Sequence, residues 1–98
     1  MKNLTTKQIH YLKSNAMDIK ALYQVGKDLT NPNFIDMIDK ALEARELIKV
    51  RVLNNVLEAP RTIGLDLASQ TNSYLVQIVG KVITLYRPSK KNIYKLPN

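Results

Sequence analysis

Cations are the most numerous chemically active side chains of this sequence, and because the acids gather in its middle, the net positive charge lies towards its two ends. The chain has 98 residues, with 15 lysines and arginines against eight acids and a net charge of +7. Residues 1–27 hold five lysines and one acid, residues 28–66 hold five basic residues and seven acids, and residues 67–98 hold five basic residues and no acid. Ends of one charge sign favour a polyanionic partner, because its phosphates exchange condensed counterions for protein cations. The alternative is a solvated surface that serves solubility.

The acids offer a second chemistry, namely catalysis or metal binding by grouped carboxylates. Asp36, Asp39 and Glu43 are three and four residues apart, so they would share one face of a helix. Acid–base catalysis needs such groups to converge in a cleft, which nothing else in the sequence builds, whereas acids near a helix N-terminus are stabilised by its dipole. His10 is the single histidine and there is no cysteine, which excludes a two-histidine nuclease and a cysteine-based metal site. We therefore expect no enzyme, no metal site and no cofactor.

The candidate phosphate contacts lie on three predicted elements and on the segment after them. Lys49 and Arg51 alternate with apolar residues, so they would project from one face of a strand, where they would either contact the phosphates of a polyanion, or stay solvated or pair with acids of the second helix. Lys7 and Lys13 would lie with His10 on the first helix, facing either a phosphate backbone or solvent. The all-basic end holds the remaining candidates, which are Lys81, Arg87, Lys90, Lys91 and Lys95. The last three would supply diffuse attraction. Tyr11 and Tyr86 would either stack on a base or belong to the core.

Periodicity predicts the elements that position these side chains. A capping box of Thr5 and Gln8 begins a helix over residues 6–17, with an apolar stripe at helical spacing. Residues 21–25 form a short strand that ends at Gly26. Asn33 is a plausible N-cap for a second helix, which must stop near Arg45 or Glu46, because apolar and basic residues alternate over 48–52 as in a strand.

The second half of the chain predicts a helix and a hairpin. Pro60 suits the first turn of a third helix, and Asn72 suits the left-handed conformation at its end. Strands over 74–79 and 82–87 meet in a tight turn at Gly80-Lys81, and Pro88 ends the pairing. The order helix, strand, helix, strand, helix, strand, strand predicts an α/β fold of the two-layer α+β type. Its four-stranded mixed sheet would pack with three helices.

Length and composition indicate one domain spanning residues 1–98, with a basic C-terminal tail at about 88–98. An apolar fraction of 45% suits a folded globule, and no apolar stretch reaches the roughly 20 residues of a spanning helix. We expect a cytoplasmic, monomeric protein with no membrane and no small-molecule substrate.

Three stretches carry a resemblance to a known family. They are ALEARELIKV over 41–50, YRPSK over 86–90, and Val25-Gly26-Lys27. The chain resembles, from Leu4 to Lys90, the CRM domain of the YhbY type, a family of small RNA-binding proteins associated with large ribosomal subunit assembly. The resemblance implies the αβαβαββ order and a fold similar to the C-terminal domain of translation initiation factor 3. It also implies RNA, in particular ribosomal RNA or precursor large subunits, as the partner.

The resemblance assigns a loop to RNA contact, since the family approaches RNA with a glycine-basic-X-glycine turn between a strand and a helix. Glycine lets the backbone come close to a phosphate, and the following helix N-terminus adds partial positive charge. Gly26 and Lys27 match the first two positions. Leu29 stands where the family has its second glycine, and Asp28 adds a negative charge within the loop. The alternative is that Gly26 merely ends a strand.

The expected function is RNA binding that assists ribosome assembly. The expected RNA-binding residues are Gly26, Lys27, Asp28, Leu29, Lys7, Lys13, Lys49, Arg51, Lys81 and Arg87. The alternative is a protein-interaction module that docks a ribosomal protein or an assembly GTPase through its acidic second helix. Sequence-specific DNA binding would need a recognition helix with base-reading residues, which the sequence lacks.

Overall fold

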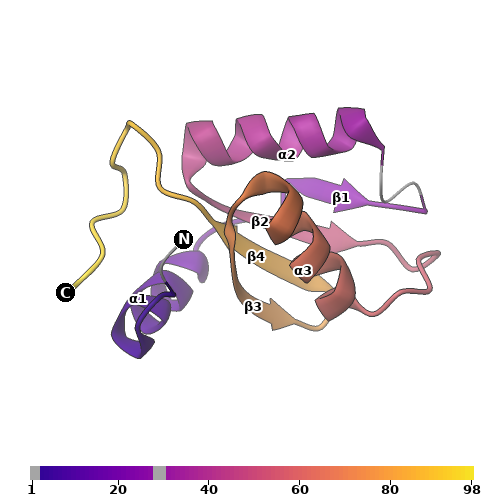
Figure 1. The fold of residues 1–98 in the computed structure, drawn as a ribbon. Helices are drawn as coiled ribbons and strands as arrows, with labels where there is room; N and C mark the ends of the chain where they lie inside the picture. Colours follow the sequence, from indigo (N-terminus) through magenta and orange to yellow (C-terminus); the bar gives the residue numbers. More distant parts are fainter. Residues whose placement is uncertain (1–2, 28–30) are drawn as a thin grey trace.

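The computed structural model describes residues 3–27 and 31–98, so Asp28 and Leu29 of the expected RNA loop lie outside the described residues. The elements follow the predicted order: α1 (Thr6–Ala16), β1 (Tyr23–Val25), α2 (Pro32–Arg45), β2 (Leu47–Val52), α3 (Pro60–Thr71), β3 (Tyr74–Val79) and β4 (Val82–Tyr86). This confirms the α+β fold with three helices and a four-stranded mixed sheet (Figure 1).

The sheet has the strand order β1-β2-β4-β3. β1 runs parallel to β2, because α2 returns the chain to the end of the sheet at which β1 began. The other pairs are antiparallel. Alternate residues of β2, from Ile48 through Val50 to Val52, are buried against α2 and α3 on one face. On that face α3 approaches so closely that a Cβ added at Gly64 would lie 2.9 Å from Leu75 Cδ1.

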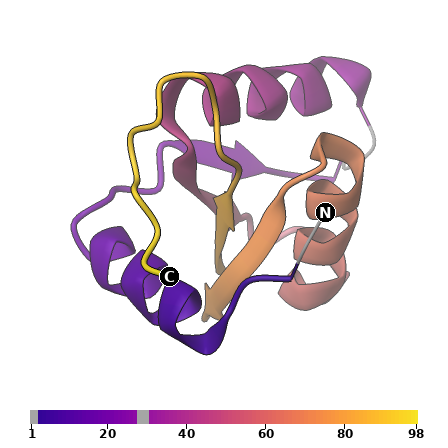
Figure 2. The same ribbon diagram turned by 60° about the vertical axis from the view of Figure 1, so that its left-hand side comes forward.

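A second apolar cluster holds α1 against the opposite face of the sheet. Leu12 and Ala16 of α1 pack there with Leu47, Val76 and Tyr86. The tail completes this cluster, since Tyr94 and Leu96 pack against it, and Gln8 Nε2 donates a hydrogen bond of 3.0 Å to the Pro97 carbonyl. Figure 2 shows the tail descending from the end of α2 to α1. The segment expected to be a basic tail is therefore also a packing element.

The caps follow the sequence closely, with one correction. Thr5 and Gln8 form the expected capping box, and Asn72 adopts the left-handed conformation, with φ 56° and ψ 46°. The N-cap of α2 is Asn31, whose Oδ1 accepts a 2.8 Å hydrogen bond from Asn33 N, so the assignment of Asn33 was wrong. Pro32 explains the difference, because its fixed φ suits the first helical position, and the cap must precede it.

The junction of α2 and β2 fastens the tail. Glu46 is fully buried and has a positive φ of 67°. Its carboxylate accepts hydrogen bonds from Ser89 Oγ at 2.7 Å, Ser89 N at 2.9 Å and Tyr94 N at 3.1 Å. Burial by itself raises the pKa of Glu46, but hydrogen bonds from the Ser89 hydroxyl and from the amides of Tyr94, Ser89 and Ile93 outweigh it and hold the pKa below its ordinary value of 4.5.

Candidate nucleic-acid interface

Helix α1 covers only part of its face of the sheet, and the uncovered part is a groove. Along β2, the residues that point towards α1 are Leu47, Lys49 and Arg51, of which only Leu47 packs under the helix. Because side chains alternate between faces along a strand, Lys49 and Arg51 emerge beyond the end of the apolar cluster. The strand face with two cations, expected from the sequence, therefore opens onto this groove.

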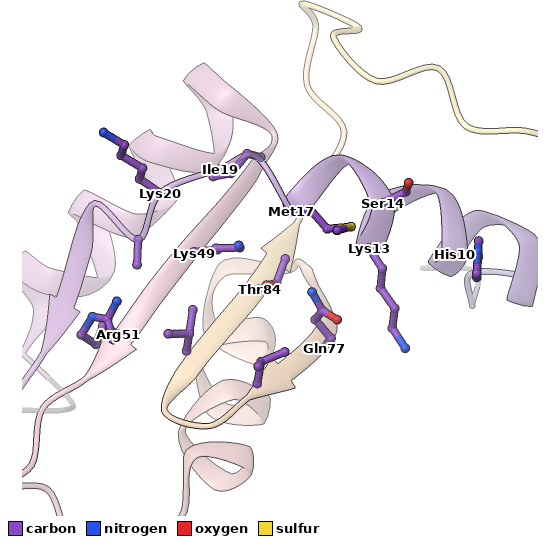
Figure 3. Close-up of a pocket in the computed structure, with 13 residues that line it drawn as sticks. His10, Lys13, Ser14, Met17, Ile19, Lys20, Lys49, Arg51, Gln77 and Thr84 are labelled. Carbon is purple, nitrogen blue, oxygen red and sulfur yellow. The ribbon is translucent and has the colours of Figure 1, made fainter.

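The groove has a volume of about 800 Å³ and lies between α1, the segment that follows it, and strands β2, β4 and β3 (Figure 3). Its described lining residues are His10, Lys13, Ser14, Met17, Ile19, Lys20, Ala21, Lys49, Arg51, Gln77, Val79, Val82 and Thr84. None of these residues is acidic. The groove is therefore a concave surface of one charge sign, which focuses the electrostatic field towards an anionic ligand.

The groove cations have no partners among residues 3–27 and 31–98. Lys13, Lys20, Lys49 and Arg51 form no ion pair with a described residue. Two cations outside the groove are engaged: Lys40 pairs with Asp36 at 3.0 Å, and Arg87 pairs with Asp39 and Glu43. Cations that lack counter-charges within the protein are available to bind phosphates.

A second group of candidates lies at the adjoining end of the sheet. Gly26 and Lys27 directly follow β1, and Lys81 sits in the β3–β4 turn next to Val82, which pairs with Arg51. Lys27 and Lys81 are exposed, and Lys81 Nζ donates to Asn54 Oδ1 at 3.2 Å. These cations would extend the positive surface beyond Arg51.

Gly26 is not required by the fold. A Cβ placed on it would be 3.6 Å from Leu53 Cδ1, an ordinary contact, and its φ lies outside the left-handed region. Gly80 differs, because its φ of 58° is one that residues with side chains rarely adopt. Any need for a glycine at position 26 must therefore come from something outside the described residues.

Two side chains considered for RNA contact lie elsewhere. The Arg87 guanidinium lies against α2 and the C-terminal end of α3, where it also donates to the Asp39 carbonyl at 2.9 Å and the Thr71 carbonyl at 2.8 Å, and its side chain is only 15% exposed. It takes no part in the groove. Tyr86 is buried in the second apolar cluster, so base stacking by its ring is excluded. Lys7 is exposed on α1 but outside the groove lining.

The groove floor contains a residue that sequence periodicity would place in the core. Leu75 pairs with Leu85, and Gln77 pairs with Thr84, the next residue along β4. Val76 therefore has no partner and is the extra residue of a β-bulge in β3. Leu75 packs on the core beneath α3, whereas Val76 joins the α1 cluster and Gln77 lines the groove. Bulges re-aim side chains in this way. Without the bulge, Gln77 would face α3.

The sequence and fold match those of known proteins. A family model described as the CRS1 / YhbY (CRM) domain matches residues 4–87. The chain belongs to this family. Its CRM domain is 46% identical over 89 residues to Bacillus subtilis YqeI, named a probable RNA-binding protein, covering 91% of this chain and 93% of YqeI. It is 32% identical over 97 residues to a Haemophilus influenzae protein named RNA-binding protein, covering 99% and 98%.

A solved structure has the same fold as this CRM domain. The solution structure of a Staphylococcus aureus protein, proposed there to bind RNA, superposes with a TM-score of 0.82 at 45% identity, covering 97% of this chain and all of that one. The residues matched by the family model include every element that lines the groove and stop before the tail. Within the described residues, no helix has the length and hydropathy needed to span a bilayer.

Proposed function

We propose that this CRM domain binds RNA in the groove, and that it acts on ribosomal RNA in precursor large ribosomal subunits, where it assists assembly. The observation that carries the proposal is a groove with no acid among its described lining residues and with four cations, Lys13, Lys20, Lys49 and Arg51, that form no ion pair with a described residue. The family membership supports it, since relatives are named RNA-binding proteins. The ribosomal target rests on the resemblance to the YhbY type.

Binding would combine electrostatic capture with recognition of backbone shape. The four groove cations contact phosphates, and Lys27 and Lys81 continue the path at the end of the sheet. Gly26 allows the RNA backbone to approach the main chain after β1, and contacts by Asp28 and Leu29 remain part of the proposal. Lys7 and the tail lysines act at longer range, so their attraction is screened more strongly by salt. The protein works as a monomer in this scheme.

The salt dependence of affinity tests the proposal. Six phosphate contacts to a single strand predict a slope of about −4 for log affinity against log salt concentration, and each lost contact reduces the slope by about 0.7. We expect Lys49→Gln and Arg51→Gln each to do so in a fluorescence anisotropy titration. Lys40→Gln is the matched control, because Lys40 lies on α2 and pairs with Asp36. Equal slopes for all three variants and the original protein would contradict the assignment of the groove.

The ribosomal target needs a separate experiment. Sucrose-gradient sedimentation of a lysate should show the protein with large-subunit precursors, released by salt or ribonuclease. Sedimentation only at the top of the gradient, at low and moderate salt, would remove this part of the proposal.

Docking of a protein partner through the acids of α2 has less support. Asp36 is paired with Lys40, and Asp39 and Glu43 are paired with Arg87. Two cations therefore offset most of the charge of these three acids, which makes α2 a poor site for a basic partner.

A further inference from the structure

Resting on the proposed function, we propose that the groove takes single-stranded RNA, and that one unstacked base lies on its floor and is read by the Gln77 side chain. The juxtaposition that carries this inference is an unbonded amide on an apolar floor between two sets of cations.

The lining of the groove is more apolar than phosphate binding requires. Met17 is 79% exposed and Val79 is 64% exposed, and Val82, Ile19 and Ala21 line the same groove. Contact with a ligand that removes this surface from water is favourable in proportion to the apolar area covered. A duplex presents phosphates and sugars while its base faces remain stacked inside. An unstacked base offers the flat apolar surface that would cover the floor.

The groove cations lie at positions where they could contact the phosphates of a single-stranded RNA. Lys13 projects from α1, and Lys49 projects from β2 on the other side of Thr84 (Figure 3). The floor lies between them. Phosphates held at either border would direct the attached bases inward, over the strands. A volume of about 800 Å³ is within the range of roughly 300–1,000 Å³ in which proteins hold small organic groups, whereas a stacked helix is too bulky to enter.

Gln77 supplies the polar group for specificity. Its side chain makes no hydrogen bond to another described residue, and Figure 3 shows its amide pointing into the groove between Thr84 and α1. The β-bulge at Val76 places it there instead of in the core. A carboxamide presents a donor beside an acceptor, and it would contact N6 and N7 of an adenine in the bidentate geometry that glutamine uses with this base. Gln77 is thus a specificity-determining residue that prefers adenine.

The inference is tested with three RNAs of equal length at one salt concentration: oligo(A), oligo(U) and a hairpin duplex. The original protein should bind oligo(A) more tightly than oligo(U), and both more tightly than the duplex. Gln77→Leu should reduce the preference for oligo(A) by about tenfold while leaving oligo(U) binding nearly unchanged. Gln77→Ala provides a second variant if the leucine disturbs folding.

The apolar floor has its own matched pair of variants. Val79→Ser should weaken binding of both single strands by about threefold to fivefold, because it removes apolar contact without changing charge. Leu57→Ser is the control, since Leu57 is 97% exposed but lies outside the groove, and it should leave affinity unchanged.

The outcomes separate the two proposals. If the duplex binds as tightly as the single strands, the single-strand inference is overturned and RNA binding stands. Equal affinity for oligo(A) and oligo(U), or a Gln77→Leu variant that keeps the preference, overturns the role of Gln77. If none of the three RNAs binds, the proposed function fails, and this inference fails with it.

Discussion

Replacing Glu46 by alanine should release the tail and lower the free energy of unfolding. The shortest hydrogen bonds to its carboxylate, of 2.7–3.1 Å, come from one hydroxyl and two backbone amides, those of Ser89 and Tyr94. Hydrogen bonds to a charged group contribute about 1.5–3 kcal/mol each when their loss leaves buried partners. Ser89 and Tyr94 are only half-buried, so water would partly replace the acceptor and about 1 kcal/mol per bond is the better figure. Glu46→Ala should therefore cost about 3 kcal/mol.

The backbone of Glu46 provides an internal check on this magnitude. Its φ of 67° is unfavourable for a residue with a Cβ, by roughly 1 kcal/mol or slightly more. Glu46→Gly loses the same hydrogen bonds but relieves that strain, so it should cost about 1 kcal/mol less than Glu46→Ala. Urea unfolding followed by circular dichroism gives both values. Glu58→Ala, an exposed acid in the loop before α3, is the control and should change stability by less than about 0.5 kcal/mol.

The free energy of unfolding should fall at acid pH, as expected for a carboxyl group whose pKa is lowered in the folded protein. The pKa of Glu46 is lower in the folded protein than its ordinary value of 4.5. The group therefore contributes its stability fully above that value and loses it as pH falls through the lower folded pKa. The stability difference between the original protein and Glu46→Gln should shrink as the pH falls below 4.5. Unchanged unfolding energies for Glu46→Ala at neutral pH would refute the account of the tail as fastened by this carboxylate.

Three further predictions concern other parts of the molecule. Gly26→Ala should leave the melting temperature unchanged, because a Cβ fits beside Leu53, but should weaken RNA binding several-fold if the backbone approaches a phosphate there; unchanged affinity would remove the glycine from the interface. Arg87→Met should lower stability by about 1–2 kcal/mol in urea unfolding, because it breaks the contacts with Asp39, Glu43 and the Thr71 carbonyl, without changing the salt slope of RNA binding. Burial raises the pKa of Tyr86 to about 12, so stability should fall between pH 10 and pH 12 as the unfolded tyrosine ionises first, and Tyr86→Phe should flatten this decline.

The elements of the fold were predictable where local chemistry decides them. Pro60, Asn72 and Gly80 each occupy a backbone position that few other residue types suit, and the structure has them in their expected places. The alternation over Ile48–Val52 predicted both faces of β2, since burial follows the period of two. The N-cap of α2 was missed, although Pro32 at the first helical position was a sufficient signal.

The site was predictable only in part, because tertiary contacts decide which charges stay free. Lys49 and Arg51 were found from alternation, whereas Lys20 lies between α1 and β1, where no periodicity indicates a direction. Gln77 carries no charge, and a bulge turns it towards the groove. Arg87 is held by acids 44 and 48 positions earlier in the chain, a distance at which sequence patterns give no guidance. The apolar residues Tyr94 and Leu96 were the available signal that the tail packs.

The way in which the tail completes the α1 cluster has a consequence for folding during synthesis. Leu12 and Ala16 leave the ribosome early and their buried partners Leu47, Val76 and Tyr86 follow, but Tyr94 and Leu96, which complete the cluster, are translated after every other element has been made. Contacts so distant along the chain form slowly, because closing the intervening loop costs entropy. We expect the core beneath α2 and α3 to fold on the nascent chain before α1 packs stably against the sheet. Hydrogen exchange on a chain stopped after residue 91 should then show unprotected amides in α1 and protected ones in β2. Because α1 forms one wall of the RNA groove, the groove would be complete only after Tyr94 and Leu96 have been translated.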